Sequence, residues 1–64
     1  MGIEYYYIKL KSIDYDERDW FLVEDGLSHS PNGVRIFYTI DEAIDVKKFL
    51  QEVHKGYTVE IERF

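Results

Sequence analysis

Cysteine is absent from this chain of 64 residues, so no disulfide can stabilise the fold and the commonest zinc ligand sets are excluded. Histidine is scarce too, since His29 and His54 are far apart in the sequence and lack the spacing of metal ligands. A chain this short hides only about 60% of the surface that its unfolded form exposes. With disulfides and the commonest metal sites excluded, self-association is the remaining way to add stability to so small a core. We therefore expect one domain over residues 1–64, without a metal or cofactor.

Basic residues are also fewer than acidic ones. Eight Lys and Arg residues stand against thirteen Asp and Glu residues, and the formal net charge is −5. Phosphate backbones attract clustered Lys and Arg, so direct nucleic-acid binding is not expected. No apolar run approaches the roughly 20 residues that a membrane-spanning helix needs, and residues 1–4 lack the features of a signal peptide. These absences predict a cytoplasmic protein without a membrane partner.

Alternating apolar and polar residues predict strands at both ends of the chain. Residues 3–13 and 57–64 alternate in this way, and residues 20–23 form a compact aromatic and β-branched run. The order Ser30-Pro31-Asn32-Gly33 favours a type I turn closed by a glycine bulge. It predicts a hairpin between a strand that runs from Trp20 to about Ser28 and a strand over residues 34–38. Asp25-Gly26 is interpreted as a bulge within the first of these strands.

The pattern after this hairpin predicts one helix. Thr39 and Glu42 match a capping box, in which each side chain satisfies a backbone amide of the first turn. Gly56 fits the position that ends a helix. Residues at helical spacing form an apolar stripe, which consists of Ala43, Val46, Leu50 and Val53 and is widened by Ile44 and Phe49.

These elements define an α+β fold of order βββαβ, a four-stranded, mostly antiparallel sheet with one helix on one face. A right-handed crossover would place the last strand parallel beside either the first or the third strand. We expect it beside the first, which gives the strand order 3-2-1-4. For the second strand, an inward pair of Trp20 and Leu22 and an inward pair of Phe21 and Val23 both remain open. The other residues expected to face the helix are Tyr6, Ile8, Leu10, Val34, Ile36, Tyr38, Tyr57, Val59 and Ile61. Those expected on the opposite face are Tyr5, Tyr7, Lys9, Arg35, Phe37, Thr58, Glu60 and Glu62.

Two clusters could suggest chemistry, and both have simpler explanations. Ser28-His29-Ser30 places hydroxyl groups beside an imidazole, but neighbouring residues point apart and no orienting acid follows. Asp14, Asp16 and Asp19 lack the glycine and the distal glutamate of a calcium loop, and fit a solvated connection. We therefore expect no catalytic residue, no metal ligand and no enzymatic activity.

The uncovered sheet face gives the main functional hypothesis. One helix can cover only one face, which leaves Tyr5, Tyr7, Arg35 and Phe37 on the other, and aromatic and Arg residues are enriched at protein interfaces. This face could bind a second copy of the chain or a different protein, or its rings could pack across strands in contact with water. The alternative function is an acidic mimic of nucleic acid that inhibits a DNA- or RNA-binding protein.

A resemblance adds to this hypothesis. Phe37-Tyr38-Thr39 leads into Asp41-Glu42-Ala43, and Gly56-Tyr57-Thr58-Val59-Glu60 follows the helix. This order resembles a pattern in small phage and prophage accessory proteins. The resemblance covers about the last 30 residues and contains no functional motif. It implies a non-enzymatic protein that acts by binding a host protein.

Overall fold

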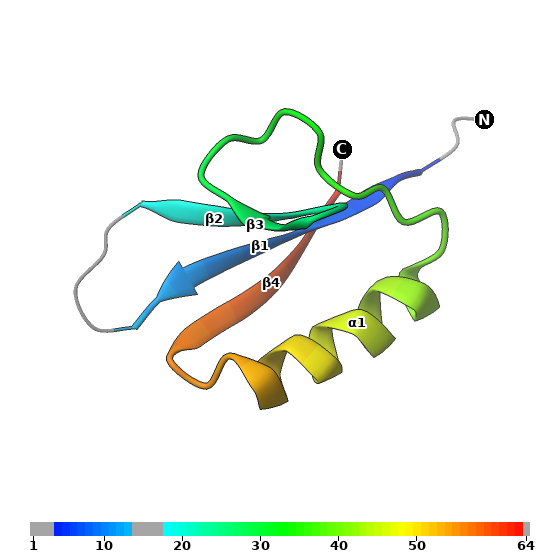
Figure 1. Ribbon diagram of the computed structural model, residues 1–64. Coiled ribbons are helices and arrows are strands. Elements are labelled where there is room, and N and C mark those ends of the chain that lie inside the picture. Colours follow the sequence, from blue (N-terminus) through cyan, green and yellow to red (C-terminus); the bar gives the residue numbers. More distant parts are fainter. Residues whose placement is uncertain (1–3, 14–17, 64) are drawn as a thin grey trace.

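The computed structural model describes residues 4–13 and 18–63, which form one sheet and one helix (Figure 1). The elements are β1 (Tyr6–Ser12), β2 (Asp19–Val23), β3 (Gly26–Ser28), α1 (Ile40–Val53) and β4 (Tyr57–Arg63). The predicted α+β class and the order βββαβ are therefore confirmed. Most of the polar connection that includes Asp14 and Asp16, together with residues 1–3 and 64, lies outside the described residues.

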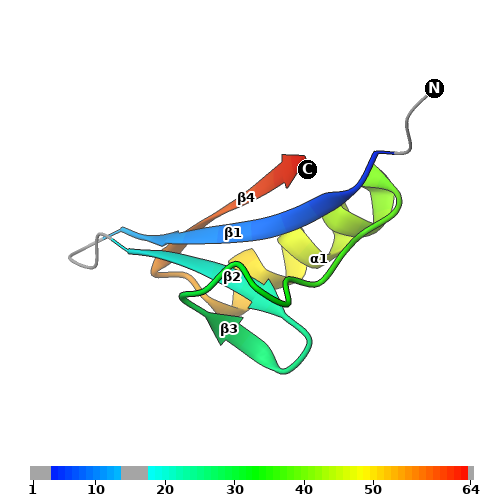
Figure 2. The same ribbon diagram turned by 90° about the horizontal axis from the view of Figure 1, so that it is seen from above.

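The sheet has the order β3-β2-β1-β4, and every neighbouring pair is antiparallel (Figure 2). β1 and β4 pair along their whole length, from Tyr6 opposite Arg63 to Ser12 opposite Tyr57. The expected parallel orientation of the last strand is therefore wrong. The segment before α1 returns to the start of β1, where Phe37 pairs with Tyr6. From there α1 runs along β1, and the short connection after it makes β4 run back.

The hairpin lies elsewhere than predicted. β2 and β3 are joined by Glu24 and Asp25, and Val23 pairs with Gly26 across the turn. Gly26 has φ +139°, whereas no described residue other than glycine has positive φ. Asp25-Gly26 is therefore part of a chain reversal and not a bulge inside one long strand, and the glycine supplies the backbone conformation that the reversal needs.

The predicted turn forms one residue later and closes a loop, not a hairpin. The amide of Val34 donates to the carbonyl of Pro31 at 3.4 Å, and Gly33 at the third position has φ +79°. A positive φ at the third position is typical of a type II turn, so the expected type I turn is wrong.

The predicted strand over residues 34–38 is also wrong, because this segment makes only two isolated bridges. β1 and β2 pair only as far as Lys9 and Phe21. Beyond that point the amide of Arg35 donates to the carbonyl of Leu22, and Phe37 exchanges two backbone hydrogen bonds with Tyr6. The segment thus joins β2 to β1 where the two strands separate.

The helix begins where the sequence predicts. Thr39 is the N-cap, and its Oγ1 accepts a hydrogen bond from the amide of Glu42 at 3.3 Å. At the other end the amide of His54, the C-cap residue, donates to the carbonyl of Leu50. Gly56 follows two residues later without a positive φ, so its predicted role as the helix-ending glycine is wrong.

The core lies between α1 and the sheet. Its buried residues are Ile8, Leu10, Leu22, Phe37, Ala43, Leu50 and Val59. Trp20 packs against this core in a half-buried position. The open question about the second strand is thereby answered, because Trp20 and Leu22 face inward.

The two loop glycines allow a matched test of the backbone. We expect Gly33→Ala to lower the free energy of unfolding by about 1 kcal/mol, because an alanine at φ +79° is strained. Gly56→Ala is the control, since a Cβ there meets no atom within 4 Å and its φ is not positive. The control should leave stability unchanged or raise it by up to about 1 kcal/mol. Urea unfolding measures both, and equal losses would contradict the turn geometry.

Candidate interaction surfaces

The sheet face away from α1 is a mixed polar and aromatic surface whose side chains already interact with one another. The rings of Tyr7 and Phe21 lie 6.2 Å apart. Lys9 Nζ lies 3.2 Å from Glu62 Oε1 and 3.9 Å from Glu60 Oε2. The hydrogen bond to Glu62 raises the pKa of Lys9, although desolvation acts in the opposite direction. Glu60 and Glu62 thus lie beside a lysine on this face.

The four residues predicted to bind a partner do not form one cluster on this face. The ring of Tyr5 meets that of Tyr38 edge to face at 5.3 Å, whereas Tyr7 contacts Phe21. Arg35 lies with its guanidinium carbon 5.0 Å from the centre of the Phe37 ring. Phe37 itself is only 2% exposed.

Phe37 is therefore a core residue, and its predicted place on the outer face is wrong. The prediction assumed that residues 34–38 form a strand in the same alternation as the rest of the sheet. In the structure this segment makes bridges only at Val34 and Phe37, and Tyr38, expected to face the helix, is 66% exposed. A buried ring cannot contact a partner, so Phe37 cannot take part in the predicted contact. Partner binding by Tyr5, Tyr7 and Arg35 stays a prediction.

The helix leaves part of its own side of the sheet uncovered. Of the described strands, only β1 and β4 lie against α1. The backbone of α1 does not lie against β2 or β3, although the inward Leu22 of β2 is still buried in the core. Trp20 and Leu27 belong to this uncovered part, and both are half-buried and packed against the edge of the core.

A row of apolar side chains on α1 borders the same region. Val46, Phe49 and Val53 follow one another at helical spacing beside the buried Leu50, and Phe49 is 61% and Val53 56% exposed. In Figure 1, α1 lies beneath the sheet and runs from right to left. Because α-helices are right-handed, the face of α1 that carries this row then points to the side of the sheet where β2 and β3 lie. Ile44, Phe49 and Val53 belong to the predicted apolar stripe, but they are exposed and not part of the core.

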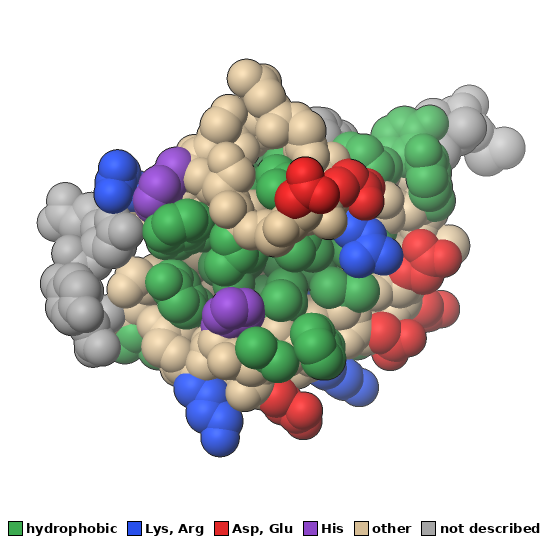
Figure 3. Space-filling view, in the orientation of Figure 1, with side chains coloured by type: hydrophobic (Ala, Val, Ile, Leu, Met, Phe, Trp, Pro, Cys, Tyr) green, Lys and Arg blue, Asp and Glu red, His purple; other side chains and the backbone are tan. Residues whose placement is uncertain are grey.

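We call the region formed by Trp20, Leu27, Val46, Phe49 and Val53 the α1–β2 surface. Figure 3 looks onto it and shows hydrophobic side chains gathered between the helix and the β2–β3 hairpin. Ile40 and Ile44 lie on the other flank of the helix, and Ile44 is 36% exposed. Contiguous exposed apolar surface of this kind marks contact sites in soluble proteins.

One end of this surface is stiffened by a ring stack. The rings of Trp20 and His29 lie 3.6 Å apart at 36°, and His29 Nδ1 is 3.1 Å from the carbonyl oxygen of Asp19. Trp20 Nε1 is buried and has no hydrogen-bond partner among the described residues. The tryptophan is thus held by packing and not by a hydrogen bond of its own.

Charges are distributed unevenly around the α1–β2 surface. β1 and β2 are antiparallel, so the turn after β2 lies at the same end as the start of α1. That end carries Glu24, Asp25, Asp41 and Glu42. The opposite end, where β2 begins and α1 finishes, carries Arg18, His29, His54 and Lys55 together with the acidic Asp19 and Glu52. Arg35 lies at the first end, where its amide donates to the carbonyl of Leu22. In Figure 3 acidic side chains lie mainly toward the right and the histidines toward the left.

The remaining polar clusters have structural roles. Ser28 Oγ accepts from the amide of Ser30, and Ser30 Oγ accepts from the amide of Asn32, so both hydroxyls stabilise the loop before Gly33. Among the described residues, no group of three His, Asp or Glu side chains could hold a metal ion. Within the same residues, α1 is too short and too polar to cross a membrane.

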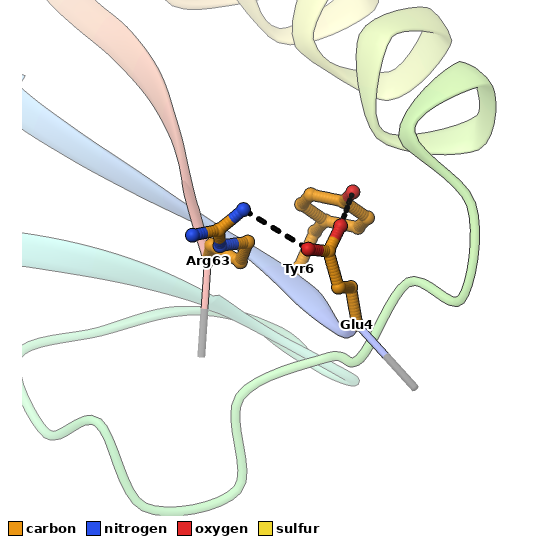
Figure 4. Close-up of polar contacts among 3 residues, drawn as sticks. All are labelled: Glu4, Tyr6 and Arg63. Atoms are coloured by element: carbon orange, nitrogen blue, oxygen red, sulfur yellow. Dashed lines mark hydrogen bonds and ion pairs between the residues drawn. The ribbon is translucent and has the colours of Figure 1, made fainter. Parts of the chain in front are cut away.

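A second cluster ties the start of β1 to the end of β4 (Figure 4). Arg63 Nη1 donates to Glu4 Oε1 at 3.0 Å, and the Tyr6 hydroxyl donates to Glu4 Oε2 at 3.0 Å. The hydrogen bond to Glu4 raises the pKa of Tyr6. Each of the three groups satisfies another, so the cluster fastens the residue before β1 to the end of β4.

Comparison with known protein families, with curated proteins and with solved structures found no match to this chain. The likeness to phage accessory proteins therefore stays a prediction. The α1–β2 surface was missed from the sequence, although one signal for it was present. The apolar stripe from Ala43 to Val53 is wider than the part of a helix that a small sheet can cover, and its excess residues are the exposed ones.

Proposed function

We propose that this chain is a non-enzymatic protein-binding module whose contact surface is the α1–β2 surface. The exposure of Phe49 and Val53 beside the uncovered side chains of β2 and β3 supports this proposal most strongly. A helix normally buries its apolar stripe, and a partner would cover what the sheet leaves open. The cytoplasmic location and the phage origin expected from the sequence stay predictions.

The outer sheet face supports the proposal less well. Its aromatic contact is the pair of Tyr7 and Phe21, and Lys9 beside this pair interacts with the carboxylates of two glutamates. Ion pairs of this kind are compatible with direct contact to water. On the α1–β2 surface Trp20 stacks on His29, whereas Phe49 and Val53 are exposed, so a partner would replace water mainly on the helix side of this surface.

Site-specific crosslinking tests the choice between the two faces. A photoreactive benzoyl derivative of phenylalanine is placed at Phe49 on the α1–β2 surface or at Phe21 on the outer face, in the full chain and in the cells that make it. Circular dichroism first shows that each labelled chain folds. We expect covalent adducts after irradiation from position 49 and none from position 21.

The masses of the adducts identify what is bound. Adducts from position 21 alone would move the contact surface to the outer face. Their absence from both positions would overturn the proposal that the chain is a binding module.

A further inference from the structure

β4 forms a long, open edge of the sheet. It pairs with β1 along all seven of its residues, and no described strand pairs with its other side. Figure 2 shows β4 at the border of the sheet, with no described element beyond it. The opposite edge is β3, which has only three residues. An edge strand as long as β4 presents a row of backbone groups to which another extended chain can bind.

The backbone groups that face this edge follow from the pairing of β4 with β1. The amide of Ile13 donates to the carbonyl of Gly56 at 3.0 Å, and this bond continues the register of the two strands. In an antiparallel pair, residues that exchange hydrogen bonds alternate with residues that do not. Counted from Gly56, the residues of β4 that bond to β1 are Thr58, Glu60 and Glu62. Val59 and Ile61 therefore direct their amides and carbonyls toward the open edge.

Two carboxylates line the outer side of this edge. The side chains of Glu60 and Glu62 are 43% and 37% exposed, and they share Lys9 of β1. Lys11 lies opposite Thr58 on the same strand as Lys9. Neighbouring strands are about 4.8 Å apart, so both lysines would be about twice that distance from a strand added at the edge. The direct neighbours of such a strand would be the glutamates.

The helix side of the edge offers apolar contacts. Ile61 is half-buried and packs against the core. Ile40 and Ile44, on the flank of α1 away from β2, are 41% and 36% exposed. Arg63 on this side is already bound to Glu4, and the lysines of α1 are separated from the outer carboxylates by the sheet itself. An added strand would thus meet apolar groups on one face and carboxylates on the other.

We propose that the open edge of β4 binds an extended peptide segment as a fifth strand, with Lys or Arg opposite Glu60 and Glu62 and apolar side chains toward α1. Such a strand repeats on the free side of β4 the pattern of β1, where Lys9 lies opposite Glu60. Opposite charges on neighbouring strands stabilise their pairing. No residue of this edge belongs to the α1–β2 surface, so it is a second binding site beside the one proposed above.

A second copy of the chain fits this edge poorly. Glu60 is the central residue of β4. Antiparallel pairing of two β4 strands along their whole length would therefore place the two Glu60 side chains opposite each other, and like charges in that position oppose pairing. The net charge of −5 adds to the repulsion. The carboxylates thus disfavour a second copy and favour a basic partner.

Amide exchange of the full chain, followed by ¹H–¹⁵N correlation spectra, tests the site. The probe is a synthetic peptide as long as β4 in which lysine and valine alternate. In the free chain, the amides of Val59 and Ile61 should exchange at least about tenfold faster than those of Glu60 and Glu62, which bond to β1. At ten times its dissociation constant, the lysine peptide should slow exchange at Val59 and Ile61 by about tenfold.

Titrations with a second peptide, in which glutamate replaces lysine, test the charge selection. The unaltered chain should bind the lysine peptide at least about tenfold more tightly, since the cross-strand pairs change from attractive to repulsive. Glu60→Gln/Glu62→Gln should reduce this preference to about threefold or less. Asp45→Asn/Glu52→Gln, which removes two charges from the polar side of α1, is the matched control and should keep it. Circular dichroism shows that each variant folds.

Unchanged exchange at Val59 and Ile61 with the lysine peptide would overturn the edge as a binding site. Equal binding of the two peptides, or a preference that survives in Glu60→Gln/Glu62→Gln, would refute the selection of a basic strand. Slower exchange of the same two amides when the chain alone is concentrated would replace the peptide by a second copy. None of these outcomes depends on the crosslinks from position 49.

Discussion

Replacement of Phe37 by alanine is expected to lower the free energy of unfolding by about 3–5 kcal/mol, the usual cost of emptying a buried aromatic site. Phe37 is 2% exposed and lies in the core although its neighbours are loop residues. A domain of this length has a total stability of roughly 3–10 kcal/mol, so this one substitution can remove most of it. Urea unfolding followed by circular dichroism measures the loss.

Tyr38→Ala is the matched control, because the neighbouring ring is 66% exposed. We expect the control to cost less than about 1 kcal/mol. If Phe37→Ala is unfolded without urea, Phe37→Leu should still fold and show a smaller loss. A larger loss at Tyr38 than at Phe37 would restore the strand alternation predicted from the sequence and contradict the structure.

Along β2, truncation of the smaller side chain, Leu22, is expected to lower the free energy of unfolding more than truncation of the larger one, Phe21. Leu22 is buried in the core, and Leu22→Ala should cost about 2–4 kcal/mol. Phe21 lies on the outer face against Tyr7, and Phe21→Ala should cost about 1 kcal/mol or less.

The comparison uses the same unfolding assay for two adjacent residues of one strand. On side-chain size alone the phenylalanine would be expected to lose more stability. A greater loss for Phe21→Ala would therefore mean that β2 presents its other face to the helix.

Hydrophobic periodicity correctly predicted the helix and the strands whose residues keep the same kind of surroundings along their whole length. β1 and β4 alternate along their length, and the helix begins at its capping box, so local sequence and tertiary structure agree there. The predicted hairpin was wrong because two turn signals, Asp25-Gly26 and Asn32-Gly33, lie seven residues apart, and Asp25-Gly26 was interpreted as a bulge. Both sites form turns, and only the pairing of β2 with β3 decides which turn makes the hairpin.

The segment from Val34 to Phe37 could not be predicted from alternation, because it has no regular alternation to follow. It makes two isolated bridges where β1 and β2 separate, and this separation is a property of the sheet and not of the segment. Because residues 34–38 were predicted to form a strand, Phe37 was wrongly placed on the outer face and Tyr38 in the core. The candidate contact surface is therefore not the outer face predicted from the sequence but the part of the inner face that α1 leaves uncovered.

The most direct test of the α1–β2 surface is a dilution series of ¹H–¹⁵N correlation spectra of the full chain. Association changes the chemical shifts of residues at the contact, and each face has its own reporters. Where copies of the chain associate, the account predicts concentration-dependent shifts at Trp20, Leu27, Val46, Phe49 and Val53, with little change at Tyr7, Lys9, Phe21 and Glu60. Concentration-dependent shifts confined to this second group would contradict the α1–β2 surface as the contact surface.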